Sequence, residues 1–207
     1  MKRPNLSDFS VSRETEDKLR AYHAILLKWQ KTINLISPKT VEDSWDRHFI
    51  DSVQILPLVP EHVKTIYDLG SGAGFPGMVF GICLSHKAVT LIESDSKKCA
   101  FLSAVSRETG SNVSIQNMRI EVATGTLPAP DLVSARALAS LLELLNYIKP
   151  WIEKNPDLQA LFPKGAAFAE EIRAARSAGW NFDCAETASV TDPDARILHL
   201  SRIKLGA

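Results

Sequence analysis

The chain has 207 residues, of which 45% are hydrophobic and 23% are charged, and its 24 basic residues balance 24 acidic ones. This size fits one domain with a short appendage. A formal net charge of zero speaks against binding that depends on bulk positive charge alone, although it leaves room for a local basic face. Three scattered cysteines are too few for a disulfide framework or a zinc site, so we expect reduced thiols and no bound metal.

The beginning of the chain carries basic residues but no apolar core region after them, which is unlike a signal peptide. No stretch approaches the ~20 consecutive apolar residues of a membrane span. We therefore expect a soluble, cytoplasmic protein that does not bind membranes and that is a monomer.

Two helices are predicted before the first strand. Residues 12–36 carry apolar side chains at steps of three and four, with Ser12 as the N-cap. A second helix is expected over residues 40–57, because Thr40 and Asp43 have the spacing of a capping box. The chain is thus expected to divide into an N-terminal helical extension, residues 1–60, and one compact domain, residues 61–207.

Short apolar runs alternate with helical segments from Val63 onward. Strands are expected at Thr65–Leu69, Ala88–Glu93, Val113–Asn117, Asp131–Ala135 and Leu158–Pro163, and as a closing hairpin at Asn181–Val190 and Arg196–Ile203. Helices are expected near Pro76–Leu84, Ser96–Thr109, Ser140–Trp151 and Ala167–Ala178. The alternation predicts an α/β fold with a mostly parallel, doubly wound sheet, an antiparallel hairpin at its end and a ligand at the carboxyl ends of the strands. Five leucines after the fourth strand are most simply core residues: Leu138, Leu141, Leu142, Leu144 and Leu145.

A glycine-rich loop, DLGSGAGFPG at Asp68–Gly77, follows the first predicted strand. Its glycines fit two overlapping spacings, G-x-G-x-G and G-x-G-x-x-G: Gly70, Gly72, Gly74 and Gly77. Glu93 ends the next strand, where an acid binds the hydroxyls of a ribose. A dinucleotide and S-adenosylmethionine both carry a ribose, and a bare tight turn is the alternative without a ligand.

Two features favour S-adenosylmethionine. Asp68, just before the glycines, suits the cationic amino group of that cofactor. The Tyr-x-x-x-Lys pair of compact dehydrogenases is absent, because the position where its lysine would stand is Ser71 after Tyr67 and Trp151 after Tyr147. A nicotinamide-dependent oxidoreductase and an RNA-binding or assembly factor that has lost catalysis remain as competing interpretations.

Six segments together resemble the RsmG (GidB) family of bacterial 16S rRNA methyltransferases, which methylate N7 of a guanine in the decoding region. These segments are WQKTINL at Trp29–Leu35, RHFIDS at Arg47–Ser52, DLGSGAGFPG at Asp68–Gly77, ESDSKK at Glu93–Lys98, ARALA at Ala135–Ala139 and KG at Lys164–Gly165. The combination of RH-x-x-DS with GSGAGFPG goes beyond a general methyltransferase loop. The ordered set covers most of the chain.

The resemblance implies a Rossmann-like class I methyltransferase that uses S-adenosylmethionine and acts on 16S rRNA, the small ribosomal subunit or its assembly intermediate. With the loop reading above, the expected cofactor-binding residues are Asp68, Gly70, Gly72, Gly74, Phe75, Glu93, Ile120, Glu121 and Arg136. The residues expected to position the substrate are Arg136, Arg47, His48 and Asp51. The residues expected to contact RNA are Arg119, Lys164 and Asn34. The chain departs from the family at Ile120, where many members have alanine, and at Ala135, which replaces a serine and leaves a substrate hydrogen bond in doubt.

Several of these residues have simpler interpretations. Arg47 and Asp51 have the spacing of a surface ion pair, in which Asp51 would anchor Arg47 beside a half-buried His48. Asn34 is either a helix C-cap or a polar group in the same cleft. Basic residues on the first two helices and near the end of the chain fit either a phosphate-contacting rim or a solvated face: Lys28, Lys31, Lys39, Arg47, Lys164, Arg196, Arg202 and Lys204.

The methyl acceptor is constrained by what the chain lacks. No cysteine lies directly after the fourth predicted strand, where a nucleophile for pyrimidine carbon 5 belongs. The segment DLVSARALAS at that place also lacks the prolines of the motif that holds an exocyclic amine acceptor. Guanine N7 has a free lone pair and no proton to lose, so in-line attack on the methyl group needs no general base. Because arginine does not deprotonate, Arg136 and Arg119 are expected to bind guanine O6 or phosphate.

Overall fold

In the computed structural model, which describes residues 5–206, seven strands form one sheet in the order β3-β2-β1-β4-β5-β7-β6. The strands are β1 Thr65–Leu69, β2 Ala88–Glu93, β3 Val113–Asn117, β4 Leu132–Ser134, β5 Gln159–Lys164, β6 Trp180–Ala188 and β7 Arg196–Leu205. Strands β1 to β5 are parallel to one another, and β7 is antiparallel to β5 and β6. The expected doubly wound sheet with a closing hairpin is confirmed, and the predicted bounds of the first three strands are met.

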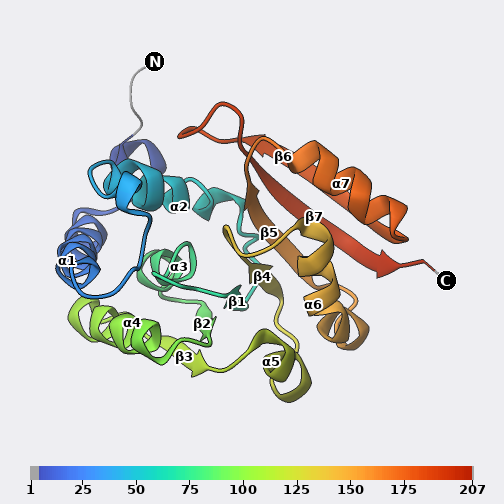
Figure 1. Ribbon diagram of the computed structural model, residues 1–207, viewed down its shortest axis with the longest axis horizontal. Coiled ribbons are helices and arrows are strands. Elements are labelled where there is room, and N and C mark those ends of the chain that lie inside the picture. The colour runs from blue at the N-terminus through green and yellow to red at the C-terminus, as the bar shows by residue number, and fades with distance from the viewer. Residues whose placement is uncertain (1–4, 207) are drawn as a thin grey trace.

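Helices cover both faces of the sheet (Figure 1). The α-helices are α1 Arg13–Gln30, α2 Asp51–Val53, α3 Gly77–Cys83, α4 Ser96–Thr109, α5 Ile120–Thr126, α6 Leu141–Lys154 and α7 Phe168–Ser177. Residues of α1, α2, α3 and α4 share one apolar cluster with one side of the sheet, and residues of α5, α6 and α7 share another with the opposite side. The N-terminal helices therefore add to the layer formed by α3 and α4.

Helix α5 is absent from the sequence-based prediction. Its segment IEVATGT contains glycine and four β-branched residues, all of which have weak helix propensity. Its buried Ala123 belongs to the apolar cluster on one side of the sheet, and the helix packs against α6 and β2, so packing supplies what local propensity lacks.

The first helix starts as predicted, with the Ser12 side chain accepting from the Thr15 amide, but it ends at Gln30 rather than at residue 36. The Gln30 side chain causes this early end. Its Oε1 accepts from the amides of Leu35 and Ile36 at 2.9 and 3.0 Å, and its Nε2 donates to the Ile36 carbonyl at 2.8 Å. These bonds hold the chain in a turn, where an α-helix would have continued.

The prediction of one continuous helix over residues 40–57 is wrong. A 3-10 turn at Pro38–Thr40 is followed by a π-helical turn at Trp45–Ile50, the short α2 and a 3-10 turn at Leu56–Leu58. The expected capping box is not formed, because Thr40 Oγ1 donates to the Ser37 carbonyl at 2.8 Å. Among residues 5–206, no helix combines the length and the apolar character needed to cross a bilayer.

Candidate active site

Two adjoining cavities lie at the carboxyl ends of the parallel strands, on either side of the loop that follows β4. The larger one has a volume of about 540 Å³, and its lining includes Gly70, Glu93, Ile120, His48 and Arg136. The second has a volume of about 290 Å³ and is also lined by Arg136. The order of strands reverses between β1 and β4, which is where doubly wound sheets bind ligands. The larger volume is typical of a small-molecule site.

The glycine loop forms one wall of the larger cavity. Gly70 and Gly72 have φ angles of 58° and 55°, in the left-handed region that glycine adopts without strain. The Gly72 amide donates to Glu93 Oε2 at 2.8 Å, and Glu93 Oε1 accepts from the Asp95 amide at 2.8 Å. Glu93 therefore fixes the loop to the end of β2 while it also lines the cavity.

Two other glycines of the loop act through packing. A side chain at Gly74 would come within 2.7 Å of the Tyr22 hydroxyl, and Gly74 does not line either cavity. A side chain at Gly77 would come within 2.5 Å of the Asp68 Cβ, so glycine lets α3 approach β1 closely. The sequence predicted that Pro76 is the first residue of the helix. In the structure Pro76 is the N-cap, and the helix begins at Gly77.

Asp68 lies beneath the loop and does not line the cavity. Its side chain is 0% exposed, and the Ser134 hydroxyl donates to Oδ1 at 2.7 Å. Burial raises the pKa of this carboxyl to about 6, against the hydroxyls of Ser134 and Ser71 and the Gly77 amide, which lower it. The structure therefore assigns Asp68 a position that supports the loop, whereas the sequence predicted a contact with the cofactor.

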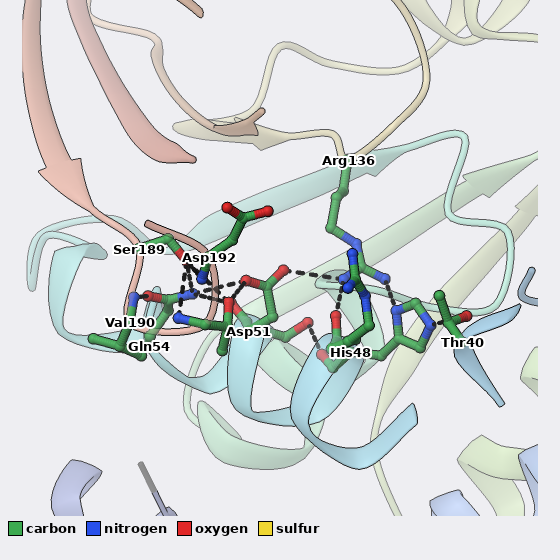
Figure 2. Close-up of polar contacts among 11 residues, drawn as sticks. Thr40, His48, Asp51, Gln54, Arg136, Ser189, Val190 and Asp192 are labelled. Atoms are coloured by element: carbon green, nitrogen blue, oxygen red, sulfur yellow. Dashed lines mark hydrogen bonds and ion pairs between the residues drawn. The ribbon is translucent and has the colours of Figure 1, made fainter. Parts of the chain in front are cut away.

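Arg136 lies at the boundary of the two cavities and is held by the segment RHFIDS. Its Nη1 donates to the Arg47 carbonyl at 3.0 Å and to Asp51 Oδ2 at 3.1 Å, and its Nη2 donates to His48 Nδ1 at 2.8 Å. Figure 2 shows the contacts of the Arg136 guanidinium with His48 and Asp51. The same group lies over the Phe75 ring, 5.1 Å from its centroid. One side chain is thus oriented by four groups.

These contacts define the protonation state of His48. Because arginine only donates, Nδ1 accepts and the ring proton lies on Nε2, which bonds Thr40 Oγ1 at 3.2 Å. Burial, together with the charges of Arg136 and Arg47, lowers the pKa of His48 to about 3. The ring also stacks on Phe75 with a centroid distance of 5.2 Å. His48 is therefore a neutral acceptor.

Asp51 connects Arg136 to the loop between β6 and β7. Its Oδ1 accepts from Gln54 Nε2 at 2.8 Å and from the Thr191 hydroxyl at 2.5 Å. Gln54 continues the connection, because its Oε1 accepts from the Val190 amide at 2.8 Å (Figure 2). The hairpin is therefore tied to the N-terminal helices. The sequence gives no local signal for this, since Gln54 and Val190 are 136 positions apart.

The structure places several of the predicted basic and polar residues differently from the simplest interpretation of their spacing. Asp51 pairs with Arg136 and not with Arg47, whose side chain is exposed at the rim of the second cavity. Lys164 lines that cavity but is 8% exposed, and its Nζ donates to the Ala139 carbonyl at 2.7 Å and pairs with Glu171 at 2.8 Å. Asn34 is exposed, lines neither cavity and is not the C-cap of α1, which is Lys31.

The loop after β4 contains two features that the sequence did not indicate. Leu138 is 38% exposed, lines the larger cavity and lies directly over Gly70, so it is not a core residue. Ala137 has a φ angle of 52° and lines both cavities. A left-handed conformation is uncommon for alanine, so the surrounding contacts hold this backbone in place.

The remaining predicted cofactor residues, Phe75, Ile120 and Glu121, line the larger cavity with Glu93. Arg119, which was predicted to contact RNA, lines it as well. A doubly wound sheet with a glycine turn after β1 and an acid at the end of β2 fits both a dinucleotide-binding fold and a class I methyltransferase fold, and the comparisons with known proteins decide for the second. The solved structure of cofactor-bound Rv0187 from MTB is similar, with a TM-score of 0.61, 14% identity and 98% of both chains covered.

Residues 15–200 match the family described as rRNA small subunit methyltransferase G (GidB). The chain is 43% identical to Ribosomal RNA small subunit methyltransferase G of Rhizobium meliloti over 202 residues, 96% of this chain and 94% of that protein. It is 47% identical to the protein of the same name from Rhodospirillum centenum over 195 residues, 94% of this chain and 88% of that protein. The chain belongs to the rRNA small subunit methyltransferase G family.

S-adenosylmethionine is the methyl donor of this fold and family, and the larger cavity fits it. Glu93 offers carboxylate lone pairs to a ribose, and Gly70 and Gly72 leave space for the close approach of a ligand. Ile120 is half-buried and supplies apolar surface for an adenine.

Proposed function

We propose that this protein transfers a methyl group from S-adenosylmethionine to N7 of a guanine in 16S rRNA. The observation that carries this proposal is the position of Arg136, which lines the cofactor cavity and the adjoining second cavity at once. A methyl donor in one and an acceptor base in the other would meet at this residue. The printed names of the relatives support rRNA of the small subunit as the substrate.

In this proposal one acidic residue, two glycines and an apolar side chain bind the cofactor. Glu93 binds the ribose hydroxyls, Gly70 and Gly72 face the rest of the cofactor, and Ile120 with Glu121 borders the adenine. When bound, S-adenosylmethionine supplies an electrophilic methyl group. The protein contributes position and orientation, which account for a large share of the rate in group transfer.

The acceptor attacks in line without a general base. Guanine N7 has no proton to lose, and the histidine at the cavity is poorly suited to accept one, because its pKa is lowered to about 3 by burial and its Nδ1 is occupied by Arg136. Thiolate chemistry is also disfavoured. Burial raises the pKa of Cys83 to about 12, of Cys184 to about 11 and of Cys99 above its ordinary value.

Arg136 orients the acceptor through guanine O6 or an adjacent phosphate. Its ion pair with Asp51 supports this role, because the carboxylate partly offsets the positive charge near a purine that becomes cationic on methylation. Arg119 and Arg47, both exposed at the cavity walls, contact the RNA backbone in this scheme.

The test uses purified protein, labelled S-adenosylmethionine and small subunits from cells that lack the modification, with free 16S rRNA and assembly intermediates as parallel substrates. The expected label lies on N7 of one guanine. Calorimetry with the cofactor is the companion measurement. Label on an adenine amine or a pyrimidine carbon would disprove the N7 assignment, and cofactor binding without transfer to any of the three RNAs would favour an assembly factor.

A further inference from the structure

The second cavity is lined by three acidic side chains, and two of them are already engaged. Asp51 binds Arg136, Gln54 and Thr191. Glu171 Oε2 binds Lys164 Nζ at 2.8 Å and accepts from the Leu141 amide at 2.6 Å. Both therefore hold the cavity walls together, and neither is free to bind a ligand without the loss of a structural contact.

Asp192 is the third acid. Hydrogen bonds hold it in place, but one of its carboxylate oxygens is left without a partner among the described residues. Its amide donates to Ser189 Oγ at 3.3 Å, and its Oδ1 accepts from the Asp194 amide at 3.0 Å. Its Oδ2 has no partner in the described part of the chain. Figure 2 shows the carboxylate directed away from Ser189 and Gln54, on the side from which Arg136 enters. The loop thus presents a fixed acceptor to the second cavity.

We propose that the second cavity binds the acceptor base and that Asp192 reads the Watson–Crick edge of guanine. This inference rests on the proposed function and names the residue that selects the base. A carboxylate accepts hydrogen bonds from N1–H and from the N2 amine of guanine. The guanidinium groups of Arg47 and Arg136 line the same cavity and can donate to guanine O6. The volume of about 290 Å³ admits one base taken out of its stack.

The arrangement discriminates against the other purine. Adenine would turn the lone pair of its N1 toward the carboxylate. The desolvated carboxylate would then lack a hydrogen-bond donor, which disfavours adenine. Recognition of the Watson–Crick edge also leaves N7 unprotected on the neighbouring edge of the ring. Selection of the base and exposure of the methylated atom then follow from the same contact.

A double-mutant cycle between protein and RNA tests this contact. Asp192→Asn, which keeps the shape of the side chain, is compared with Asp194→Asn, a control acid in the same exposed loop whose backbone bond to Asp192 is retained. Each protein methylates small subunits reconstituted with guanosine or inosine at the mapped position, since inosine lacks only the N2 amine. The readout is the single-turnover rate.

Loss of a hydrogen bond to a charged group predicts a fall of about 10- to 100-fold for wild type on inosine and for Asp192→Asn on guanosine. Inosine should slow Asp192→Asn by less than about 3-fold further, because the contact is already lost. Asp194→Asn should follow wild type.

Three results would overturn the proposal: equal rates of wild type on the two bases, a wild-type rate for Asp192→Asn on guanosine, or effects of the two changes that multiply in full. The first is decisive even if Asp192→Asn folds poorly. Wild type that methylates no guanine at N7 would instead refute the proposed function, and with it this inference.

Discussion

The glycine loop at Asp68–Gly77 and the cluster around Arg136 border the same cavity but are built in opposite ways. The loop is one continuous strand–turn–helix, and its shape depends on positive φ angles and on side chains that are absent. Arg136 is held by groups 85 to 89 positions away in the sequence, and its geometry depends on donors and acceptors that are present. Local backbone conformation shapes one wall of the site, and long-range side-chain contacts shape the other.

This difference predicts that the two regions fail under different substitutions. Added atoms should disrupt the loop, whereas the loss of a donor should disrupt the Arg136 cluster even when charge and size are nearly conserved. The loop should respond mainly in stability, because it is part of the core packing. The cluster should respond mainly in activity, because it positions the one guanidinium that lines both cavities among the described residues of the cluster.

The largest effect is expected for Arg136→Lys. A lysine keeps the charge but cannot reproduce the planar fork that reaches the Arg47 carbonyl, His48 and Asp51 together. Methyl transfer to small subunits should fall about 100-fold or more, since misplacement of a positioning group by 1 Å has effects of this size. Arg176→Lys is the matched control, because Arg176 lies over the Phe182 ring in a similar way but lines neither cavity. Equal activity of the two variants would contradict the role of Arg136.

The loop is tested by a pair of glycine substitutions. Gly77→Ala should lower the free energy of unfolding by about 3 kcal/mol, because the new Cβ would lie 2.5 Å from both Asp68 Cβ and Leu91 Cδ2. An added Cβ at Gly72 would contact only the Gly70 carbonyl oxygen, at 3.8 Å. Gly72→Ala should therefore lower the free energy of unfolding by only about 1 kcal/mol, because alanine is strained at a φ of 55°. Denaturant unfolding measures both. The opposite ranking would show that backbone conformation, not close packing, dominates the loop.

The stability of the protein should also depend on pH through His48. His48→Asn removes this dependence and keeps an acceptor for Arg136. The pKa of His48 is about 3 in the folded protein and about 6.5 in the unfolded chain, so the unfolded state binds more protons between these values. Wild type should therefore lose stability as pH falls from 6.5, by about 2 kcal/mol at pH 5 relative to pH 7.

Asp68 acts in the opposite direction. Its pKa is raised to about 6, so its contribution to stability falls as pH rises from about 4 to 6. Subtracting the stability curve of His48→Asn from that of wild type cancels this contribution and isolates the histidine. Parallel curves for the two proteins between pH 4.5 and 7 would contradict a neutral, buried His48.

The smallest effect is expected for Ala137→Gly. Glycine adopts the φ angle of 52° without strain, so relief of strain should raise stability by up to about 1 kcal/mol, partly offset by the greater freedom of the unfolded chain. Methyl transfer should fall modestly, because the loop that carries Arg136 becomes less restrained. Calorimetric unfolding and a single-turnover assay separate the two changes, and a loss of stability would refute backbone strain at this position.

The sequence by itself determined the elements whose signal is local. The bounds of β1, β2 and β3 follow from short apolar runs, and the glycine turn and Glu93 follow from spacing along one strand–turn–helix unit. Helix α5 escaped prediction because its helix propensity is weak and its stability depends on tertiary packing against α6 and β2.

The tertiary structure alone decided which side chains meet. Gln30 ends the first helix through its own side chain, Asp68 lies under the loop that it precedes, and Asp51 binds Arg136 and not the nearby Arg47. No periodicity encodes a contact between residues 85 positions apart, because such pairs form only after the sheet has brought the ends of its strands together. For this reason the sequence indicated the cofactor wall of the site, whereas the arrangement around Arg136 became visible only in the folded chain.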